Sequence, residues 1–369
     1  MPLGRSKDSV TSVQATIAVF SMVIGAGILT ISREVVEAAG TSDAWLSVIV
    51  GSMISVISGV IIVKLCQRYP GKTVFEFSTE VVGFFLGKVI SVLLSIYFVF
   101  LAAYEARIMA ELVSTYLLQE TPMKIMVVLF LWVCSYLVVG GINPILKSFE
   151  YFFPVIIFLI VAILGLCLTK FDIDNLRPVL GKGIMPMLKG VSSSLLSTAG
   201  FEILLVIIAF MKKPEKAMGS MLIGITVVAV INIASVVVSI GVLSIEEIRN
   251  LTWPLAELVS AIILPEASLE DFSIFFVVIW LLSIFTTCAA ASYIGGLGIS
   301  QTFSLDFKTT IYVLLPIIYV LSVLPEDLVD VFAAGDIIGM LWPAVGIAIP
   351  VVLLIVSSIR GKRRKVGDN

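Results

Sequence analysis

Histidine is absent from this 369-residue chain, charged residues make up only 14% of it, and cysteine occurs four times. Without histidine there are no imidazole metal ligands, Ser-His-Asp triads or imidazole proton relays. Cys66, Cys134, Cys167 and Cys288 lie inside or at the edge of apolar segments and never at CxxC spacing, which is typical of small core residues. The sequence also lacks a Gly-x-Ser-x-Gly motif. We therefore expect no enzyme, no metal and no cofactor.

Apolar residues are what the chain has in excess. Hydrophobic residues make up 59% of the sequence, and the mean hydropathy is +1.13. Because runs of about 20 apolar residues predict transmembrane helices, we expect an all-α polytopic membrane protein. Its ten predicted spans are residues 13–32, 45–65, 85–118, 123–142, 151–169, 186–211, 217–243, 272–300, 309–324 and 337–358.

The lysines and arginines indicate how these spans are oriented. If the N-terminal segment 1–12 is cytoplasmic, the inner segments hold sixteen of these residues and the outer segments seven, while Arg107 lies within a span. Such a positive-inside bias predicts that both termini, including the basic tail 359–369, are cytoplasmic.

Two segments depart from a simple alternation of spans and short loops. The third span has about 33 residues, which make roughly 50 Å at about 1.5 Å each, so it must tilt or protrude. The outer loop 244–272 contains an apolar core, Leu251 to Leu264, that is too short to cross a membrane. This core is either a helix lying on the outer face over the entrance, or a plain helix in a surface loop.

Ten spans divide into two sets of five, residues 13–169 and 186–358. Since five is odd, the second set starts on the opposite side of the membrane, and repeats of this kind must be inverted. The first span then corresponds to the sixth. The first contains Gly25, Ala26 and Gly27 in its middle, and the sixth contains the run 197–200, Ser-Thr-Ala-Gly. Paired interrupted helices of this kind indicate a binding site at the midplane of a transporter.

An interrupted helix suits a polar ligand for a direct reason. Unwinding frees backbone N–H and C=O groups, which are costly in hydrocarbon unless a ligand, water or ion satisfies them. The positive N-terminal end of the half-helix that follows favours a carboxylate. Small residues in spanning helices also permit close helix packing without unwinding, so packing is the alternative reading of both segments.

Three carboxylates are predicted within spans, where an ionisable group indicates a functional site by default. Glu202 follows the interruption of the sixth span by two residues. It is expected to be protonated, or to bind a cationic group or backbone N–H groups. In the third span, Arg107 and Glu111 are four residues apart and can form a structural ion pair on one helix face.

The remaining carboxylate belongs to a stripe, because Tyr97, Leu101 and Glu105 recur every four residues. The stripe either lines a pocket or water path, or packs against apolar neighbours while Glu105 reaches outward. In the eighth span, the segment FTTCAAASYIGG offers the hydroxyls of Thr286 and Thr287. Hydroxyls within spans mostly bond to carbonyls of their own helix, so their role as ligand contacts is a hypothesis.

Four segments carry a resemblance to a known family: YEARIMAELVSTYLLQETP (104–122), FDIDNLRPVLGKGIMPMLKG (171–190), GFEILLVIIAFMKKPEKA (200–217) and FTTC (285–288). Through them the chain resembles, essentially end to end, the B-subunit or endospore germination permease family of nutrient germinant receptors. That family is similar to the amino acid–polyamine–organocation transporters. The resemblance implies a LeuT-like fold of ten helices in two inverted five-helix repeats, with helices 1 and 6 broken.

The resemblance also implies a role. The chain would bind a small germinant, often an amino acid, in the spore inner membrane and trigger germination together with an A subunit and a lipoprotein C subunit. A proton-coupled amino acid permease without a signalling role would need the same pocket, so this alternative stays open.

The expected ligand site combines the residue patterns with the family match. Backbone N–H groups near Gly25 to Gly27 would hold a carboxylate. Carbonyls of residues 197–200 and the Thr287 hydroxyl would take an ammonium or hydroxyl group. The expected ligand-binding residues are Gly25, Ala26, Gly27, Tyr97, Leu101, Glu105, Ser197, Ala199, Gly200, Phe201, Glu202 and Thr287.

Overall fold

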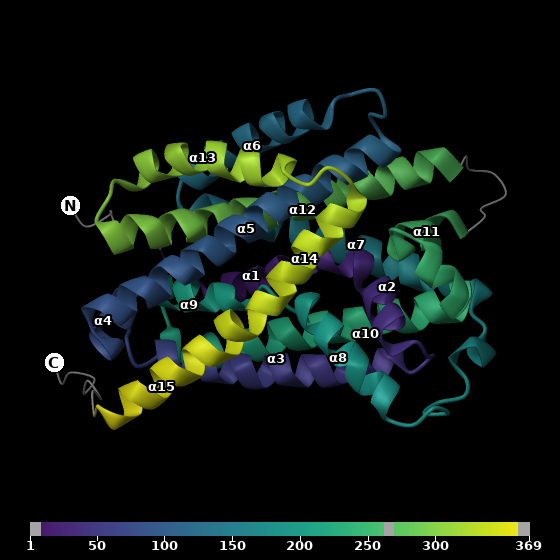
Figure 1. Cartoon of the computed structure of the whole chain (residues 1–369), viewed down its shortest axis with the longest axis horizontal. Helices are drawn as coiled ribbons and strands as arrows, with labels where there is room; N and C mark the ends of the chain where they lie inside the picture. Colours follow the sequence, from purple (N-terminus) through teal and green to yellow (C-terminus); the bar gives the residue numbers. More distant parts are fainter. Residues whose placement is uncertain (1–8, 262–268, 361–369) are drawn as a thin grey trace.

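The computed structural model describes residues 9–261 and 269–360 (Figure 1). Within these ranges the chain is helical and forms no β-strand, only an isolated bridge between Val10 and Met211. The helices are α1 (Ser12–Ile24), α2 (Gly27–Ala39), α3 (Ala44–Cys66), α4 (Val74–Val82), α5 (Phe84–Tyr116), α6 (Met123–Val139), α7 (Ile142–Cys167), η1 (Leu168–Lys170), η2 (Ile173–Leu176), α8 (Met185–Leu196), η3 (Phe201–Ile203), α9 (Leu204–Ile207), η4 (Ile208–Phe210), η5 (Pro214–Lys216), α10 (Ala217–Asn250), α11 (Pro254–Ala261), α12 (Leu269–Phe303), α13 (Phe307–Val323), α14 (Leu328–Trp342), η6 (Pro343–Ala348) and α15 (Ile349–Ile359).

The apolar helices agree with a multi-pass integral membrane protein. Six helical stretches in the described part of the chain are long and apolar enough to cross a membrane, and the bent pair of α1 and α2 makes a seventh. Three shorter apolar helices, Met123–Val139, Phe201–Phe210 and Phe307–Val323, overlap the fourth, sixth and ninth predicted spans. The all-helical fold is thus confirmed, whereas the number of ten spans stays a prediction.

The first interruption lies where the glycines predicted it. Helix α1 ends at Ile24, α2 begins at Gly27, and the two are bent by 52°. The predicted end of this span at residue 32 was wrong, because α2 continues to Ala39 and is capped by Gly40 in a left-handed conformation (φ 67°). Glu34 therefore belongs to the helix.

The second interruption follows α8. That helix ends at Leu196, residues 197–200 form a turn, and the chain continues as short helical pieces from Phe201 to Phe210. Gly200 has a φ of +124°, and a Cβ placed on it would lie 2.6 Å from the Met22 carbonyl oxygen. Only glycine suits both this conformation and this approach, so the two interruptions are in backbone contact.

Helices α5 and α12 form the most extensive helix contact among the described elements. Small residues of α12 make this possible: a Cβ on Gly295 would lie 2.8 Å from the Val99 side chain. In Figure 1 α5 runs diagonally across the centre of the molecule. This placement brings the Glu105 and Thr287 positions to the break between α1 and α2.

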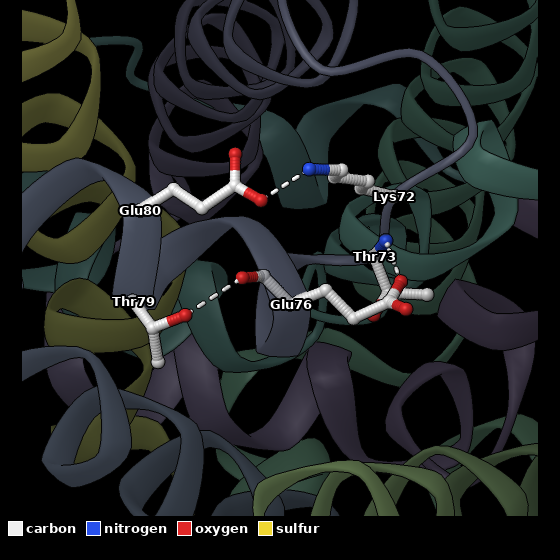
Figure 2. A network of polar contacts seen from close by, with 5 residues as sticks. All are labelled: Lys72, Thr73, Glu76, Thr79 and Glu80. Atoms are coloured by element: carbon white, nitrogen blue, oxygen red, sulfur yellow. Dashed lines mark hydrogen bonds and ion pairs between the residues drawn. The ribbon is translucent and has the colours of Figure 1, made fainter. Parts of the chain in front are cut away.

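A polar network at the connection from α3 to α5 fixes where the intervening helix α4 begins. Thr73 and Glu76 form a capping box on α4, with the Thr73 N–H donating to Glu76 Oε2 at 2.9 Å. Figure 2 shows this pair together with the Lys72–Glu80 ion pair and the hydroxyl of Thr79, which donates to the Glu76 carbonyl at 2.9 Å. Thr73 also donates to the side chain of Gln301, which ties the connection to α12.

Two predicted span starts were late. Helix α7 begins at Ile142 rather than 151 and passes through Pro154, and α14 begins at Leu328 rather than 337. The early turns of both helices contain charged residues. A prediction based on uninterrupted apolar runs therefore places the start of each helix too late. The last span also contains a π-helical segment, Pro343–Ala348, between α14 and α15, an irregularity that is frequent near functional sites.

The predicted helix in the outer loop is present as α11. It begins at Pro254 and packs against α2, α7, α10 and α12, with Leu255 and Leu258 buried. It is therefore an integral part of the bundle rather than an exposed loop helix. Residues 262–264 of the predicted segment lie outside the described residues.

Candidate ligand site at the helix interruptions

Side chains of α12 satisfy carbonyls at the first interruption. The Trp280 indole N–H donates to the Gly25 carbonyl at 3.2 Å, and the Thr287 hydroxyl donates to the Ser21 carbonyl at 3.2 Å. The same hydroxyl lies 3.1 Å from the Ser283 carbonyl of its own helix. Thr287 therefore lies at the first interruption, its role as a ligand contact stays a prediction, and its oxygen keeps the capacity to accept a hydrogen bond.

The N-terminus of α2 is bound by a carboxylate from α5. Glu105 is 4% exposed, and its Oε1 accepts the Ala26 N–H at 3.2 Å. Its Oε2 has no hydrogen-bond partner within residues 9–261 and 269–360. The helix end is thus bound by a carboxyl group that comes from the protein itself.

Gly25 is what allows this arrangement. A Cβ on residue 25 would lie 2.7 Å from Glu105 Oε1 and 3.1 Å from Thr287 Oγ1. A Cβ on Gly27 would lie 3.2 Å from the Ser197 Cα, so the two interruptions touch again at this point. A side chain at position 25 would displace the Glu105 and Thr287 side chains, and one at position 27 would press on the backbone at Ser197.

The second interruption is closed by Glu202, which is fully buried. The Tyr97 hydroxyl donates to its Oε1 at 2.8 Å, and the Gly200 N–H donates to its Oε2 at 2.8 Å. Of the partners considered for Glu202, a backbone N–H group, that of Gly200, is observed, while its protonation stays a prediction. Tyr97 of the predicted stripe therefore reaches the second interruption, while Glu105, eight residues later, reaches the first.

Other predicted site residues have other partners. The Ser197 hydroxyl donates to Glu34 Oε2 at 3.2 Å, and the Ser197 carbonyl accepts from Asn232 Nδ2 at 3.3 Å. The Phe201 ring is buried 5.7 Å from the Trp342 ring. Leu101 is buried and Ala199 is partly buried against the apolar core.

An acidic cavity adjoins the second interruption. It has a volume of about 510 Å³, is lined by residues of α2, α8 and α14, and includes Glu34, Glu37 and Asp336. A further cavity of about 280 Å³ shares these three carboxylates and extends to Tyr104. The Ser197–Glu34 hydrogen bond connects the cavity wall to the interruption. The prediction missed Glu34 because the first span was ended too early.

The contribution of Trp280 and Ser283 was also missed, although the sequence holds a signal. Trp280, Ser283 and Thr287 follow helical i, i+3, i+7 spacing and so share one face of α12. The expected pairing of Arg107 and Glu111 is confirmed, with Nε and Oε1 2.8 Å apart and both side chains buried. These two residues contact each other rather than the interruptions.

The family profile and the individual relatives that match this sequence are all spore germination proteins. The profile of a family described as spore germination protein matches residues 9–331. The chain is 39% identical over 360 residues to spore germination protein YndE of Bacillus subtilis (strain 168), covering 97% of this chain and 99% of that protein. It is 30% identical over 362 residues to spore germination protein B2 of the same organism, covering 97% and 98%.

Solved structures with a similar fold are transporters. Mhp1, a nucleobase-cation-symport-1 family transporter in a closed conformation with bromovinylhydantoin bound, aligns with a TM-score of 0.73 at 15% identity, covering 98% of this chain and 81% of that one. MhsT in complex with L-phenylalanine aligns with a TM-score of 0.67 at 13% identity, covering 97% and 99%. At these identities the likeness shows a shared fold.

Proposed function

Because the chain belongs to the spore germination protein family, we propose that it is the membrane subunit of a nutrient germinant receptor. It binds a small germinant, an amino acid, in a transporter-like pocket and triggers spore germination. One observation carries this proposal: two interrupted helices meet in backbone contact, and the N-terminus of α2 beside that contact binds a carboxylate. A helix end of this kind suits the carboxylate of an amino acid.

The proposed architecture has ten membrane spans in two inverted repeats, residues 13–169 and 186–358. Both termini lie on the spore-core side of the inner membrane. The transporter fold and the paired interruptions support this arrangement, because inverted repeats place broken helices at equivalent positions. In this orientation α2, α8 and α14 are the outer half-helices, and the acidic cavity between them leads from the outer face to the interruptions.

The proposed ligand lies between the interruptions, α5 and α12. Its carboxylate binds N–H groups near Gly25, Ala26 and Gly27, and its ammonium binds the Thr287 oxygen or a carboxylate from α5. Leu101 and Ala199 shape the space for its side chain. Ser197, Gly200, Phe201 and Glu202 with Tyr97 hold the second interruption in place beside it.

The proposed signal is a shift between two packings of the bundle. A ligand shifts such an equilibrium only through its different affinities for the two states. An A subunit and a lipoprotein C subunit would detect the shift at the membrane.

The test is a nutrient screen on spores in which this chain provides the only functional germinant-binding subunit. We expect germination with one or a few L-amino acids and none with the others. Spores that respond equally with the gene deleted would overturn the proposed function.

A proton-coupled amino acid permease is the competing function, favoured by the shared transporter fold. Uptake of labelled amino acids into vesicles that carry this chain alone distinguishes the two. We expect binding without accumulation. Accumulation that follows an imposed proton gradient would favour the permease.

A further inference from the structure

Glu105 is a buried carboxylate at the first interruption, and its hydrogen bonding is incomplete. Its Oε1 accepts the Ala26 N–H at 3.2 Å, while its Oε2 is buried without a partner in the described part of the chain. Glu202 differs, because both of its oxygens accept hydrogen bonds. A buried, unpaired polar atom is costly, so a ligand group that satisfies Glu105 would bind favourably here.

We infer that Glu105 and the carboxylate of a germinant compete for the Ala26 N–H, and that the displaced Glu105 binds the ammonium of the same germinant. The site then selects zwitterions, compounds with a carboxylate and an ammonium on neighbouring atoms. This inference rests on the proposed function, since it specifies the chemistry of that same site.

The geometry requires an exchange rather than simple addition. The hypothetical Cβ on Gly25 lies 2.7 Å from Glu105 Oε1, so this oxygen fills the space directly beside the break. A second carboxylate can reach the Ala26 N–H only if the Glu105 side chain rotates away. Glutamate has three side-chain torsions with alternative wells, and its movement breaks a single hydrogen bond.

The lack of a cationic partner for Glu105 within the described ranges explains why the ligand needs a positively charged group. The ion pairs among the described residues include Arg33–Glu37, Lys72–Glu80, Arg107–Glu111 and Arg177–Asp174, and Glu105 belongs to none of these. A ligand with a carboxylate alone would place two carboxyl groups beside one helix N-terminus, with no cation to pair with the one that is displaced. An ammonium gives the displaced Glu105 a partner of opposite charge.

A purely structural role is the alternative for Glu105, in which it only caps α2. A cap needs an acceptor at Ala26 but no charge, and the side-chain oxygen of glutamine supplies that acceptor. The two roles therefore differ in how the ligand preference responds to a neutral residue at position 105.

The experiment uses the full chain purified in lipid nanodiscs. The standard L-amino acids are first screened for ligand-dependent thermal stabilisation. Each stabilising amino acid is then compared with its N-acetyl derivative, which keeps the carboxylate but loses the ammonium. Affinities are measured for the unaltered chain, for Glu105→Gln and for Glu105→Ala, a second neutral variant. Glu111→Gln is the matched control, because it changes a buried glutamate of the same helix that is paired with Arg107.

In the unaltered chain and in Glu111→Gln we expect the amino acid to bind at least about tenfold more tightly than its N-acetyl derivative. In Glu105→Gln and Glu105→Ala this preference should shrink to about threefold or less. An unchanged preference in both neutral variants would overturn the inference and leave the proposed function intact. No stabilisation of the unaltered chain by any amino acid would overturn the proposed function, and the inference with it.

Discussion

The two helix interruptions share a design but differ in how their main-chain groups are satisfied. At the second, between α8 and η3, Glu202 accepts from both the Tyr97 hydroxyl and the Gly200 N–H, and no oxygen is left over. At the first, between α1 and α2, Glu105 accepts one N–H and retains an unpaired oxygen, while Trp280 and Thr287 bind carbonyls from across the fold. A completed network rigidifies, whereas an incomplete one leaves a polar group for a ligand.

This difference indicates that the two interruptions have different roles. The second interruption serves as a fixed support, and the first is the place where binding takes effect. Substitutions at the second should therefore act mainly on stability, and substitutions at the first mainly on the nutrient response.

The largest expected effect on stability is that of Gly200→Ala. Its Cβ would lie 2.6 Å from the Met22 carbonyl oxygen and 2.7 Å from the Met22 carbonyl carbon, both backbone atoms that cannot move aside, at a φ of +124°. We expect a loss of about 3 kcal/mol, measured as a lower Tm in detergent. Gly219→Ala is the control, because nothing lies within 4 Å of its Cβ position. Equal melting of the two variants would contradict the backbone contact between the interruptions.

Gly25→Leu should separate function from folding. The atoms it would meet are the ends of the Glu105 and Thr287 side chains, which can move, so we expect the protein to remain inserted and abundant. The nutrient response should be abolished, because the leucine fills the site. The measurements are germination of spores and immunoblotting of their membranes. Gly165→Leu, with open space around its Cβ position, should respond normally, and a full response from Gly25→Leu would count against the site.

Glu202→Gln tests whether the second interruption needs a charge. The glutamine oxygen can accept the Gly200 N–H, and its NH₂ group can donate to a Tyr97 hydroxyl that reverses its role. We expect a loss of only about 1 kcal/mol, against about 3 kcal/mol for Glu202→Leu, which leaves the Gly200 N–H unpaired. Thermal unfolding of both variants decides this, and a severe loss with glutamine would show that the anion itself is required.

Trp280→Phe should have a small effect, similar to that of Glu202→Gln. It removes the hydrogen bond to the Gly25 carbonyl but keeps a ring to stack on Phe276, which lies 5.4 Å away. We expect a loss of about 1 kcal/mol. Trp45→Phe is a matched control, since the Trp45 indole nitrogen has no partner among the described residues. A Tm unchanged in both variants would show that Trp280 does not support the first interruption.

The positions of the interruptions were predictable because small residues are local signals. Gly25 to Gly27 and the run 197–200 both lie in the middle of apolar segments, and the structure breaks there. The stripe of Tyr97, Leu101 and Glu105 was also visible, because it depends on helical spacing alone.

The partners across the fold were not predictable. That Tyr97 binds Glu202 while Glu105 binds Ala26 depends on how α5 lies over two different interruptions, which no spacing within one helix reveals. The position of Glu34 in a helix beside the second interruption was missed for another reason. The predicted span ended where the charged residues begin, whereas α2 continues through them to Ala39.

The most direct test is a structure of the full chain with a germinating L-amino acid bound. We expect the amino acid beside the first interruption, with its carboxylate on the Ala26 N–H and Glu105 turned onto its ammonium. A ligand bound elsewhere, with the hydrogen bond between Ala26 and Glu105 intact, would contradict both the site and the exchange.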